Sequence, residues 1–272
     1  MIELDGADAT AFAQAQFMND VAALEPGGWQ WNGWLTPKGR VIALFALLRI
    51  APGTLWMLVP DADIGPLSDA LRRFVFRSKV AIRPRPGLVA TASFAKPVQA
   101  SGATLAVLDG GTVELDAGTP SRPRALRLSS QSDHGPVDAE LEAAWAAADL
   151  EHGLPRLPSS QAEQWTPQQL SLERLDAFSV RKGCYPGQEI VARTHFLGKA
   201  KRGLVLLESA AALPVGAQVT NGTDALGSVV ASAATPSRGL ALAVVPLDRQ
   251  QPAAQVDGID VREAPLLDGL QR

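Results

Sequence analysis

The most informative stretch of the chain reads Arg181-Lys182-Gly183-Cys184-Tyr185-Pro186-Gly187-Gln188-Glu189. Proline suits the first position of a helix, because its missing N–H would have no partner there in any case. Glu189 in the first turn, Arg193 toward the last and Gly198 just beyond complete the pattern of a capped helix. The stretch therefore predicts a helix over residues 186–197 that begins directly after Cys184.

Cys184 is the only cysteine of the chain, and its position allows two interpretations. A thiol that faces a helix N-terminus, with Lys182 two residues away, has its thiolate favoured by both positive charges, which predicts a functional thiol. The alternative is a small buried hydrophobic side chain, and the local sequence gives the two equal weight. Gly183 and Gly187 beside it predict a positive φ or a close approach of the backbone to a ligand.

The same stretch resembles the signature of the YgfZ family, whose members are folate-binding proteins related to the glycine-cleavage T-protein (aminomethyltransferase). Further matches follow the order of the family along residues 2–205 and are weak beyond them. They are Gly6-Ala7-Asp8, Asn19-Asp20-Val21, Lys38-Gly39-Arg40, Trp145 with Glu151-x-Gly153-x-Pro155, Pro167-Gln168 with Leu172 and Leu175, and Arg193 with Gly198-Lys199-x-Lys201-Arg202. An unrelated chain is not expected to carry all of them in this order.

The resemblance implies an α+β fold of the aminomethyltransferase type, with two α+β lobes and a C-terminal antiparallel β-barrel around a central folate channel. It implies tetrahydrofolate or a one-carbon derivative as the cofactor. It also implies an accessory role in the assembly or repair of iron–sulfur enzymes, including enzymes that modify tRNA. Those enzymes would be transient partners.

Two positions depart from the aminomethyltransferase pattern and bear on catalysis. Those enzymes carry an acidic pair just after the glycine of the second hairpin strand, where this chain has Ile42 and Ala43. Without that carboxylate, aminomethyl transfer lacks a charge partner for the folate amine and a group to handle the proton. We therefore favour a binding factor over an enzyme. The alternatives are a folate-dependent one-carbon transferase and a scaffold with a vestigial folate site.

The resemblance also assigns candidate site residues. Trp145 is the candidate for stacking on the pterin ring, although its spacing from Leu141 fits core packing as well. Glu151 is the candidate for binding the amidine-like edge of the pterin, with a solvated helix-end carboxylate as the alternative. The expected thiol site comprises Cys184, Lys182 and Tyr185. The expected folate site comprises Trp145, Glu151, Lys182, Gly183, Gln188, Glu189, Arg193 and Lys199.

The chain concentrates six cations within residues 181–202. They are Arg181, Lys182, Arg193, Lys199, Lys201 and Arg202. Because Arg and Lys pair with carboxylates, this cluster is a candidate for binding the glutamate tail of folate, and a solvated basic face has equal weight. Direct binding of nucleic acid is disfavoured, since Tyr185 and Phe196 are the only aromatic residues in the cluster. The family often has Arg or Asn where Asp149 stands, so a contact to a carboxylate at this position is in doubt.

Composition narrows the class of protein. The 272 residues carry a formal charge of −3, so no global positive field attracts nucleic acid or acidic membranes. The longest apolar run, Val41–Leu48, is far too short to cross a membrane as a helix. The three histidines, His134, His152 and His195, are not spaced for a metal site. The N-terminal residues are acidic where a signal peptide is basic, so we expect a cytoplasmic protein.

Periodicity predicts helices over residues 8–24, 63–79 and 138–150, and strands over 40–50 and 54–59. Residues 84–125 predict weak strands. After residue 203, short apolar runs separated by Gly, Asn and Pro predict a small antiparallel barrel or sandwich. We therefore place a domain boundary near residue 201. Residues 1–200 would form the folate-binding region of two interleaved lobes, and residues 201–272 the barrel.

Overall fold

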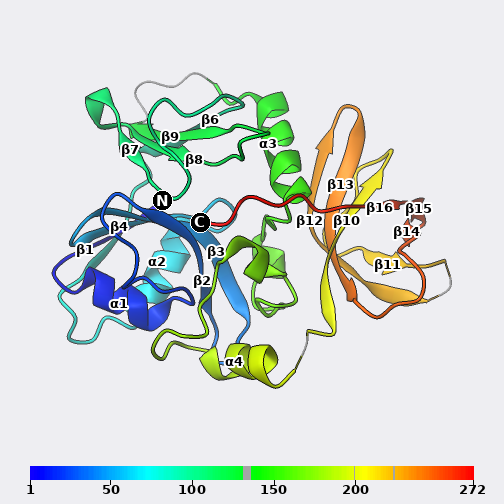
Figure 1. Ribbon diagram of the computed structural model, residues 1–272, viewed down its shortest axis with the longest axis horizontal. Coiled ribbons are helices and arrows are strands. Elements are labelled where there is room, and N and C mark those ends of the chain that lie inside the picture. The colour runs from blue at the N-terminus through cyan, green and yellow to red at the C-terminus, as the bar shows by residue number, and fades with distance from the viewer. Residues whose placement is uncertain (131–135, 199, 223) are drawn as a thin grey trace.

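The structure, a computed structural model, describes residues 1–130, 136–198, 200–222 and 224–272. Two residues that the sequence analysis named, His134 and Lys199, lie outside these ranges. The described strands form three antiparallel sheets, one in each lobe of an elongated molecule (Figure 1). No helix among the described residues is long and apolar enough to cross a membrane.

The first lobe is built on a five-stranded sheet in the order β2-β3-β4-β1-β5. Its strands are β1 (Ile2–Asp5), β2 (Trp29–Leu35), β3 (Val41–Ala51), β4 (Thr54–Leu58) and β5 (Ala81–Pro84). Helices α1 (Ala9–Gln16) and α2 (Ile64–Arg72) cover one face, where Phe12 and Leu71 pack with Phe45 and Leu47. Side chains alternate along β3, so Ala46 and Leu48 face the second lobe.

The second lobe is a four-stranded sheet in the order β6-β9-β8-β7. Its strands are β6 (Leu88–Ser93), β7 (Ala106–Val107), β8 (Val113–Asp116) and β9 (Ala125–Ser130). Leu115 and Leu128 pack with Trp29 and Leu48 of the first sheet, which joins the two lobes through one apolar cluster. The strands that residues 84–125 predict are therefore present.

The third lobe is a curved seven-stranded sheet in the order β15-β14-β11-β12-β13-β10-β16, and it confirms the expected barrel-like C-terminal lobe. Its strands are β10 (Arg202–Ser209), β11 (Gln218–Thr220), β12 (Ala225–Thr235), β13 (Arg238–Pro246), β14 (Gln255–Val256), β15 (Ile259–Asp260) and β16 (Arg262–Ala264). One face of the sheet, with Leu206 and Leu242, packs toward α3. The other face, with Leu207 and Ala243, encloses its own core.

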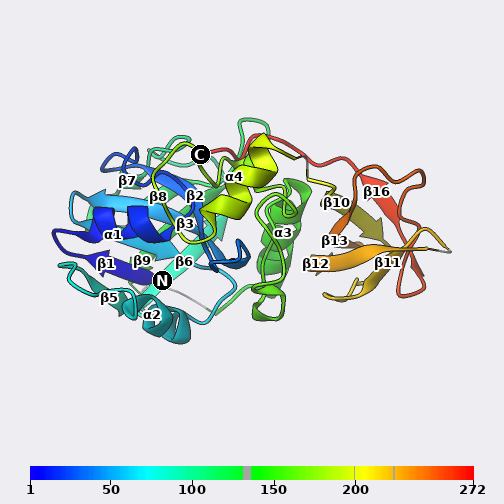
Figure 2. The same ribbon diagram turned by 90° about the horizontal axis from the view of Figure 1, so that it is seen from below.

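Helix α3 (Ala139–Glu151) stands between the first two lobes and the C-terminal sheet, as Figures 1 and 2 show. The carboxylate of Asp138 caps it by accepting hydrogen bonds from the N–H groups of Glu140 and Leu141, both at 3.0 Å. The helix predicted over residues 138–150 is confirmed. Short 3₁₀ turns occur at Asp109–Gly111, Ser159–Gln161 and Leu172–Leu175.

The helix predicted over residues 8–24 is about twice as long as the observed helix, which has 8 residues. α1 ends at Gln16, because Phe17 turns to an extended conformation and forms a bridge with Trp34 of β2. The helix predicted over residues 63–79 likewise ends early, at Arg72. In both places, tertiary contacts with the five-stranded sheet end the helix, although the sequence pattern favours a longer one.

Candidate functional site

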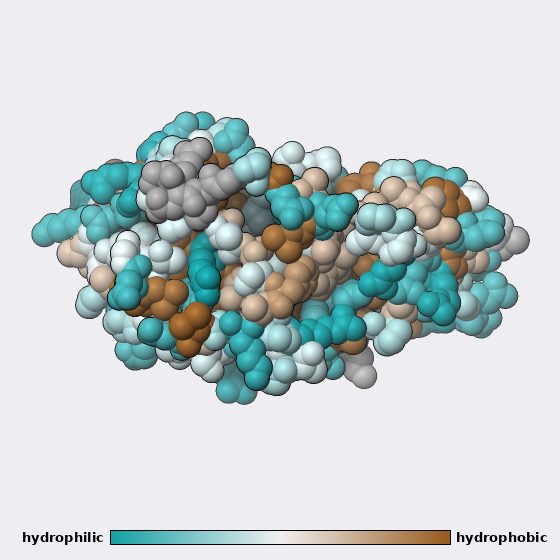
Figure 3. All heavy atoms as spheres, turned by 90° about the horizontal axis from the view of Figure 1, so that it is seen from above, coloured by the Kyte–Doolittle hydropathy of each residue, from teal (hydrophilic) through white to brown (hydrophobic). Residues whose placement is uncertain are grey.

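A cavity of about 550 Å³ lies between the first two sheets and one face of α3. Its walls are mostly apolar, and they come from elements far apart in the sequence. Leu44 and Leu58 belong to the first sheet, Ala92 and Leu126 to the second, and Trp145 to α3. Figure 3 shows the side of the molecule that carries the four-stranded sheet, where the surface is hollowed. The size and lining are typical of a site for a small organic molecule.

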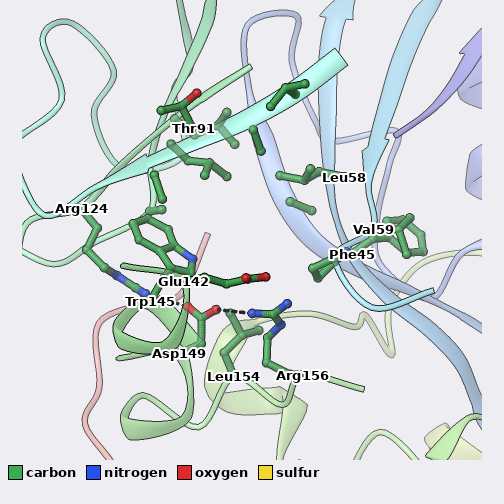
Figure 4. Close-up of a pocket in the computed structure, with 18 of the residues that line it drawn as sticks. Phe45, Leu58, Val59, Thr91, Arg124, Glu142, Trp145, Asp149, Leu154 and Arg156 are labelled. Atoms are coloured by element: carbon green, nitrogen blue, oxygen red, sulfur yellow. Dashed lines mark hydrogen bonds and ion pairs between the residues drawn. The ribbon is translucent and has the colours of Figure 1, made fainter. Parts of the chain in front are cut away.

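One end of the cavity is polar, and its centre is Asp149 of α3. Arg124 Nη1 donates to Asp149 Oδ1 at 2.7 Å, and Arg156 Nη1 lies 3.8 Å from Asp149 Oδ2. Arg156 in turn pairs with Asp61 at 2.8 Å. Figure 4 shows Asp149 between the two guanidinium groups. Burial raises the pKa of Asp149, and the attraction of Arg124 opposes this rise.

Trp145 lies one helical turn before Asp149 and faces the same cavity. The guanidinium carbon of Arg124 is 4.6 Å from the centre of the indole ring, and the ring of Phe94 is 5.8 Å away. These contacts hold the indole in place without using its N–H, for which the described residues supply no acceptor. The half-buried Trp145 therefore keeps one hydrogen-bond donor for a ligand.

Arg124 supplies a second donor without a partner. Its side chain is 2% exposed, and its Nε has no hydrogen-bond acceptor in the part of the chain that the structure describes. A buried polar group normally has a partner, because leaving it unpaired costs about 1–3 kcal/mol. Arg124 is also one of the residues that line the cavity.

Glu151, the predicted partner of the pterin edge, does not line this cavity. Its two carboxylate oxygens accept hydrogen bonds from Arg122 and Arg238. Arg122 belongs to the loop after β8, and Arg238 to β13, so Glu151 joins the second lobe to the third. The carboxylate is turned toward these cations on another side of α3.

Lys182 and Tyr185 are buried side chains of the loop that carries Cys184, which we call the thiol loop. Lys182 Nζ donates to the carbonyl oxygens of Gln14, Phe17 and Asn19 at 2.6, 2.6 and 2.9 Å. Burial lowers the pKa of Lys182 to about 8 and raises the pKa of Tyr185 to about 12. The ammonium group is thus turned toward the end of α1.

Cys184 is exposed, as are Gly183, Glu189 and Arg193. Gly183 does not have a positive φ, and a Cβ added to it would meet no atom within 4 Å. Gly187 has a φ of 80°, and a Cβ added to it would lie only 2.7 Å from the Cα of Gly39, which leaves no room for a side chain.

The close approach of Gly187 and Gly39 packs residues 181–189 against the β2–β3 turn. Because Gly187 takes a left-handed conformation, α4 (Gln188–Phe196) begins two residues later than predicted. The side chain of Gln188 donates to the carbonyl oxygen of Lys182 at 3.2 Å and so closes the loop.

The structure thus separates the residues that the sequence analysis grouped as one folate site. Trp145 lines the cavity, whereas none of the described residues 181–198 does. The sequence analysis missed Arg124 and Arg156, and it treated Asp149 as a departure from the family. The spacing of four residues between Trp145 and Asp149 places both on one helix face and was a usable signal. The two arginines come from distant segments that no local pattern connects to α3.

Ile42 and Ala43, where aminomethyltransferases carry their acidic pair, lie at the start of β3. Both pack in the apolar cluster under α1 and α2. Neither lines the cavity, to which β3 contributes Leu44, Phe45 and Ala46. The carboxylates that do line it are Asp138, Glu142 and Asp149, all at or on α3.

No protein-family model matches the chain. Among curated proteins it is similar to the tRNA-modifying protein YgfZ of Cronobacter sakazakii, with 32% identity over 218 residues that cover 74% of this chain and 66% of that protein. The YgfZ protein of Colwellia psychrerythraea is 26% identical over 223 residues, covering 76% and 68%. An uncharacterized protein of Haemophilus influenzae is 28% identical over 209 residues, covering 76% and 70%.

Among solved structures, aminomethyltransferase T of the glycine cleavage system from Bartonella henselae superposes with a TM-score of 0.68. The match covers 100% of this chain and 84% of that one at 14% identity, so it shows the fold alone. It confirms the expected three-lobed fold. Sequence relatives of the stated identity, together with this fold, show that the chain belongs to the YgfZ family.

Proposed function

We propose that the chain binds a tetrahydrofolate, or a one-carbon derivative of it, in the cavity beside α3. We also propose that it acts as an accessory protein for iron–sulfur enzymes, including enzymes that modify tRNA. The link to tRNA modification is supported by the names of two relatives, and the link to iron–sulfur enzymes rests on the family resemblance. The first part is supported by the cavity, and chiefly by one observation: Arg124 is among its lining residues, and the Nε of this side chain has no acceptor among the described residues.

A pterin ring fits the chemistry of this cavity. It is flat and aromatic, and one edge carries an acceptor oxygen beside N–H donors. Arg124 Nε can donate to such an oxygen. Asp149 can accept from such donors, because each carboxylate oxygen has two lone pairs and the arginines do not use them all. The apolar walls would cover the ring faces, and a cavity of about 550 Å³ lies within the usual range for ligand sites.

When bound, a reduced folate supplies a carrier for one-carbon groups. The residues of this chain bind its ring, orient it and exclude water. Arg193 and the other described cations of residues 181–202 are not part of this cavity, so the cavity offers no support for their contact with the glutamate tail.

The test is a titration with tetrahydrofolate followed by tryptophan fluorescence. We expect saturable quenching in the micromolar range, with an apparent Kd at least about tenfold higher in Trp145→Ala and in Arg124→Met, since each change removes about 1.4 kcal/mol or more of binding energy. Trp165→Phe is the matched control, because Trp165 does not line the cavity. The absence of saturable quenching at millimolar folate would reject the folate site.

A second measurement separates an accessory protein from a transferase. The protein, saturated with tetrahydrofolate, is incubated with a small aminomethyl donor, and release of the amine is followed. An accessory protein gives no rate above the reaction without protein. A rate that scales with protein concentration, and that falls in Asp149→Asn, would make the chain a one-carbon transferase.

A further inference from the structure

We propose that a surface between α2 and β5 binds single-stranded RNA, such as an unpaired loop of a larger RNA. We call it the Arg-Phe surface, and it comprises Arg73, Phe74, Phe76, Arg77 and Lys79. None of these residues lines the folate cavity, so the inference goes beyond the proposed function and is tested apart from it. Figure 2 shows α2 and β5 at the end of the molecule that is far from the C-terminal sheet.

The charge of this part of the chain differs from that of the whole. Residues 70–108 contain no Asp or Glu and seven cations, in a chain of net charge −3. Three of the seven form ion pairs: Arg72 with Asp69, Arg83 with Glu3 and Asp5, and Arg85 with Glu3. Of the other four, Lys96 lies beyond β6, and Arg73, Arg77 and Lys79 are exposed and have no carboxylate partner among the described residues. These three cations are therefore free to contact a polyanion.

Two phenylalanines lie among the free cations. Phe76 is 85% exposed, which is far more than an aromatic side chain usually shows. The guanidinium group of Arg77 lies over its ring, 5.2 Å from the centre. Phe74 is 50% exposed and packs edge-on against the buried Trp34 at 5.7 Å. The surface thus presents flat groups at which an unstacked base can stack, next to cations that can bind its phosphate.

The backbone that carries these side chains is tied at both ends. The N–H of Phe74 donates to the carbonyl oxygen of Leu71 at 3.0 Å. The N–H of Lys79 donates to the carboxylate of Asp8 at 2.6 Å, and the N–H of Asp8 donates back to the carbonyl oxygen of Lys79 at 3.2 Å. Because the segment is held in this way, less conformational entropy is lost when a ligand binds.

RNA fits this surface better than a membrane or an acidic protein does. A membrane-binding helix needs a free apolar face, but Leu67 and Leu71 of α2 are buried in the core. An acidic protein would pair with the cations but would leave the rings of Phe74 and Phe76 without a stacking partner. The sequence analysis disfavoured nucleic acid on the basis of residues 181–202, which form a different surface with fewer aromatic residues.

The test uses the full chain and a fluorescein-labelled single-stranded RNA of twelve nucleotides in a fluorescence anisotropy titration. We expect Phe76→Ala to weaken binding about tenfold, the effect of losing one stacked base. Arg73→Gln with Arg77→Gln should lower the slope of log Kd against log salt by about 1.4, because two phosphate contacts are lost. Folate quenching should be unchanged in all these variants, which separates this proposal from the folate site.

Phe196→Ala is the matched control, since Phe196 is 66% exposed and lies on α4 beside the other basic segment. This variant should bind the RNA like the wild type. If Phe196→Ala weakened RNA binding as much as Phe76→Ala, the proposal would be overturned. It would also be overturned if the wild type showed no saturable RNA binding at 50 mM salt (roughly a Debye length of 14 Å). The proposal would also be overturned if the protein did not bind the RNA but bound phosphatidylglycerol vesicles, and if that binding depended on Phe76.

Discussion

The ammonium group of Lys182 connects two parts of the molecule that are about 165 residues apart in sequence. Its side chain starts in the thiol loop and ends among the carbonyl oxygens of Gln14, Phe17 and Asn19, just where α1 stops. Burial disfavours its charge, and the carbonyl contacts favour it. Lys182 therefore fastens the loop that carries Cys184 to the first lobe.

Replacing Lys182 by Met should lower the free energy of unfolding by about 2–4 kcal/mol, because buried carbonyl groups lose a charged donor. Urea unfolding at pH 7 measures the change. Arg181→Met is the control, since Arg181 is exposed and should change stability by no more than about 0.5 kcal/mol. Equal stability of Lys182→Met and the wild type would contradict the fastening role.

Cys184 is exposed, so iodoacetamide should label the native protein to one equivalent without prior unfolding. Cys184→Ser should keep the wild-type stability within about 0.5 kcal/mol and should bind folate normally, because the side chain has no core contact to lose. Iron–sulfur enzyme activity should fall in cells in which this variant is the only copy. Full enzyme activity in those cells would show that the thiol has no chemical role.

At the scale of elements, sequence patterns found the helices whose ends are set locally and misjudged those whose ends are set by tertiary contacts. Asp138 and Gly153 lie at the two ends of α3, and that helix was predicted within one residue at each end. The end of α1 depends on the bridge from Phe17 to Trp34, which joins segments far apart in the fold. No local pattern contains that information.

Glu114 ties β8 to the segment before β7. It is fully buried and accepts hydrogen bonds from the N–H groups of Gln99 at 2.8 Å and Ala100 at 3.1 Å, and from Arg127 Nε at 3.1 Å. Burial alone would raise the pKa of Glu114, but these hydrogen bonds to the carboxylate outweigh it and lower the pKa from 4.5 to about 2. The ionised form is thus favoured in the folded state.

Because its pKa is lower in the folded state, Glu114 stabilises the fold above pH 4.5, and this contribution is lost as the pH falls toward 2. Glu114→Gln should therefore lower the free energy of unfolding at pH 7 by about 1–3 kcal/mol. Its difference from the wild type should shrink between pH 4.5 and pH 2. Urea unfolding at a series of pH values measures both effects. A difference that does not change with pH would contradict this account.

At the scale of the molecule, the cavity could not be predicted from the sequence because the first two lobes and α3 all contribute to it. Trp145 was identified through the family resemblance, and Asp149 could have been found from helical spacing. Arg124 follows a turn after β8, and Arg156 follows α3, so only the packing of the lobes brings their charges to one carboxylate. The resemblance gave the fold, but it did not show which cations meet at the polar end of the cavity.

Glu151 offers a test of how the lobes are joined. Its side chain is 12% exposed and pairs with Arg122 of the second lobe and Arg238 of the third. All six Trp residues lie between residues 29 and 165, so tryptophan fluorescence reports on the first 200 residues. Far-UV circular dichroism reports on the whole chain, including the C-terminal sheet. The two signals can therefore follow the lobes separately during unfolding.

In the wild type, the two unfolding curves in urea should coincide, because lobes that share buried contacts unfold together. Glu151→Gln removes the shared charge and should separate the curves, since the C-terminal sheet loses its ion pair with α3. Glu140→Gln, an exposed change in the first turn of α3, should leave them coincident. If Glu151 instead binds the pterin edge, Glu151→Gln would weaken folate binding while the two curves still coincide. The comparison thus distinguishes the joint between lobes, which the structure shows, from the ligand contact that the sequence predicts.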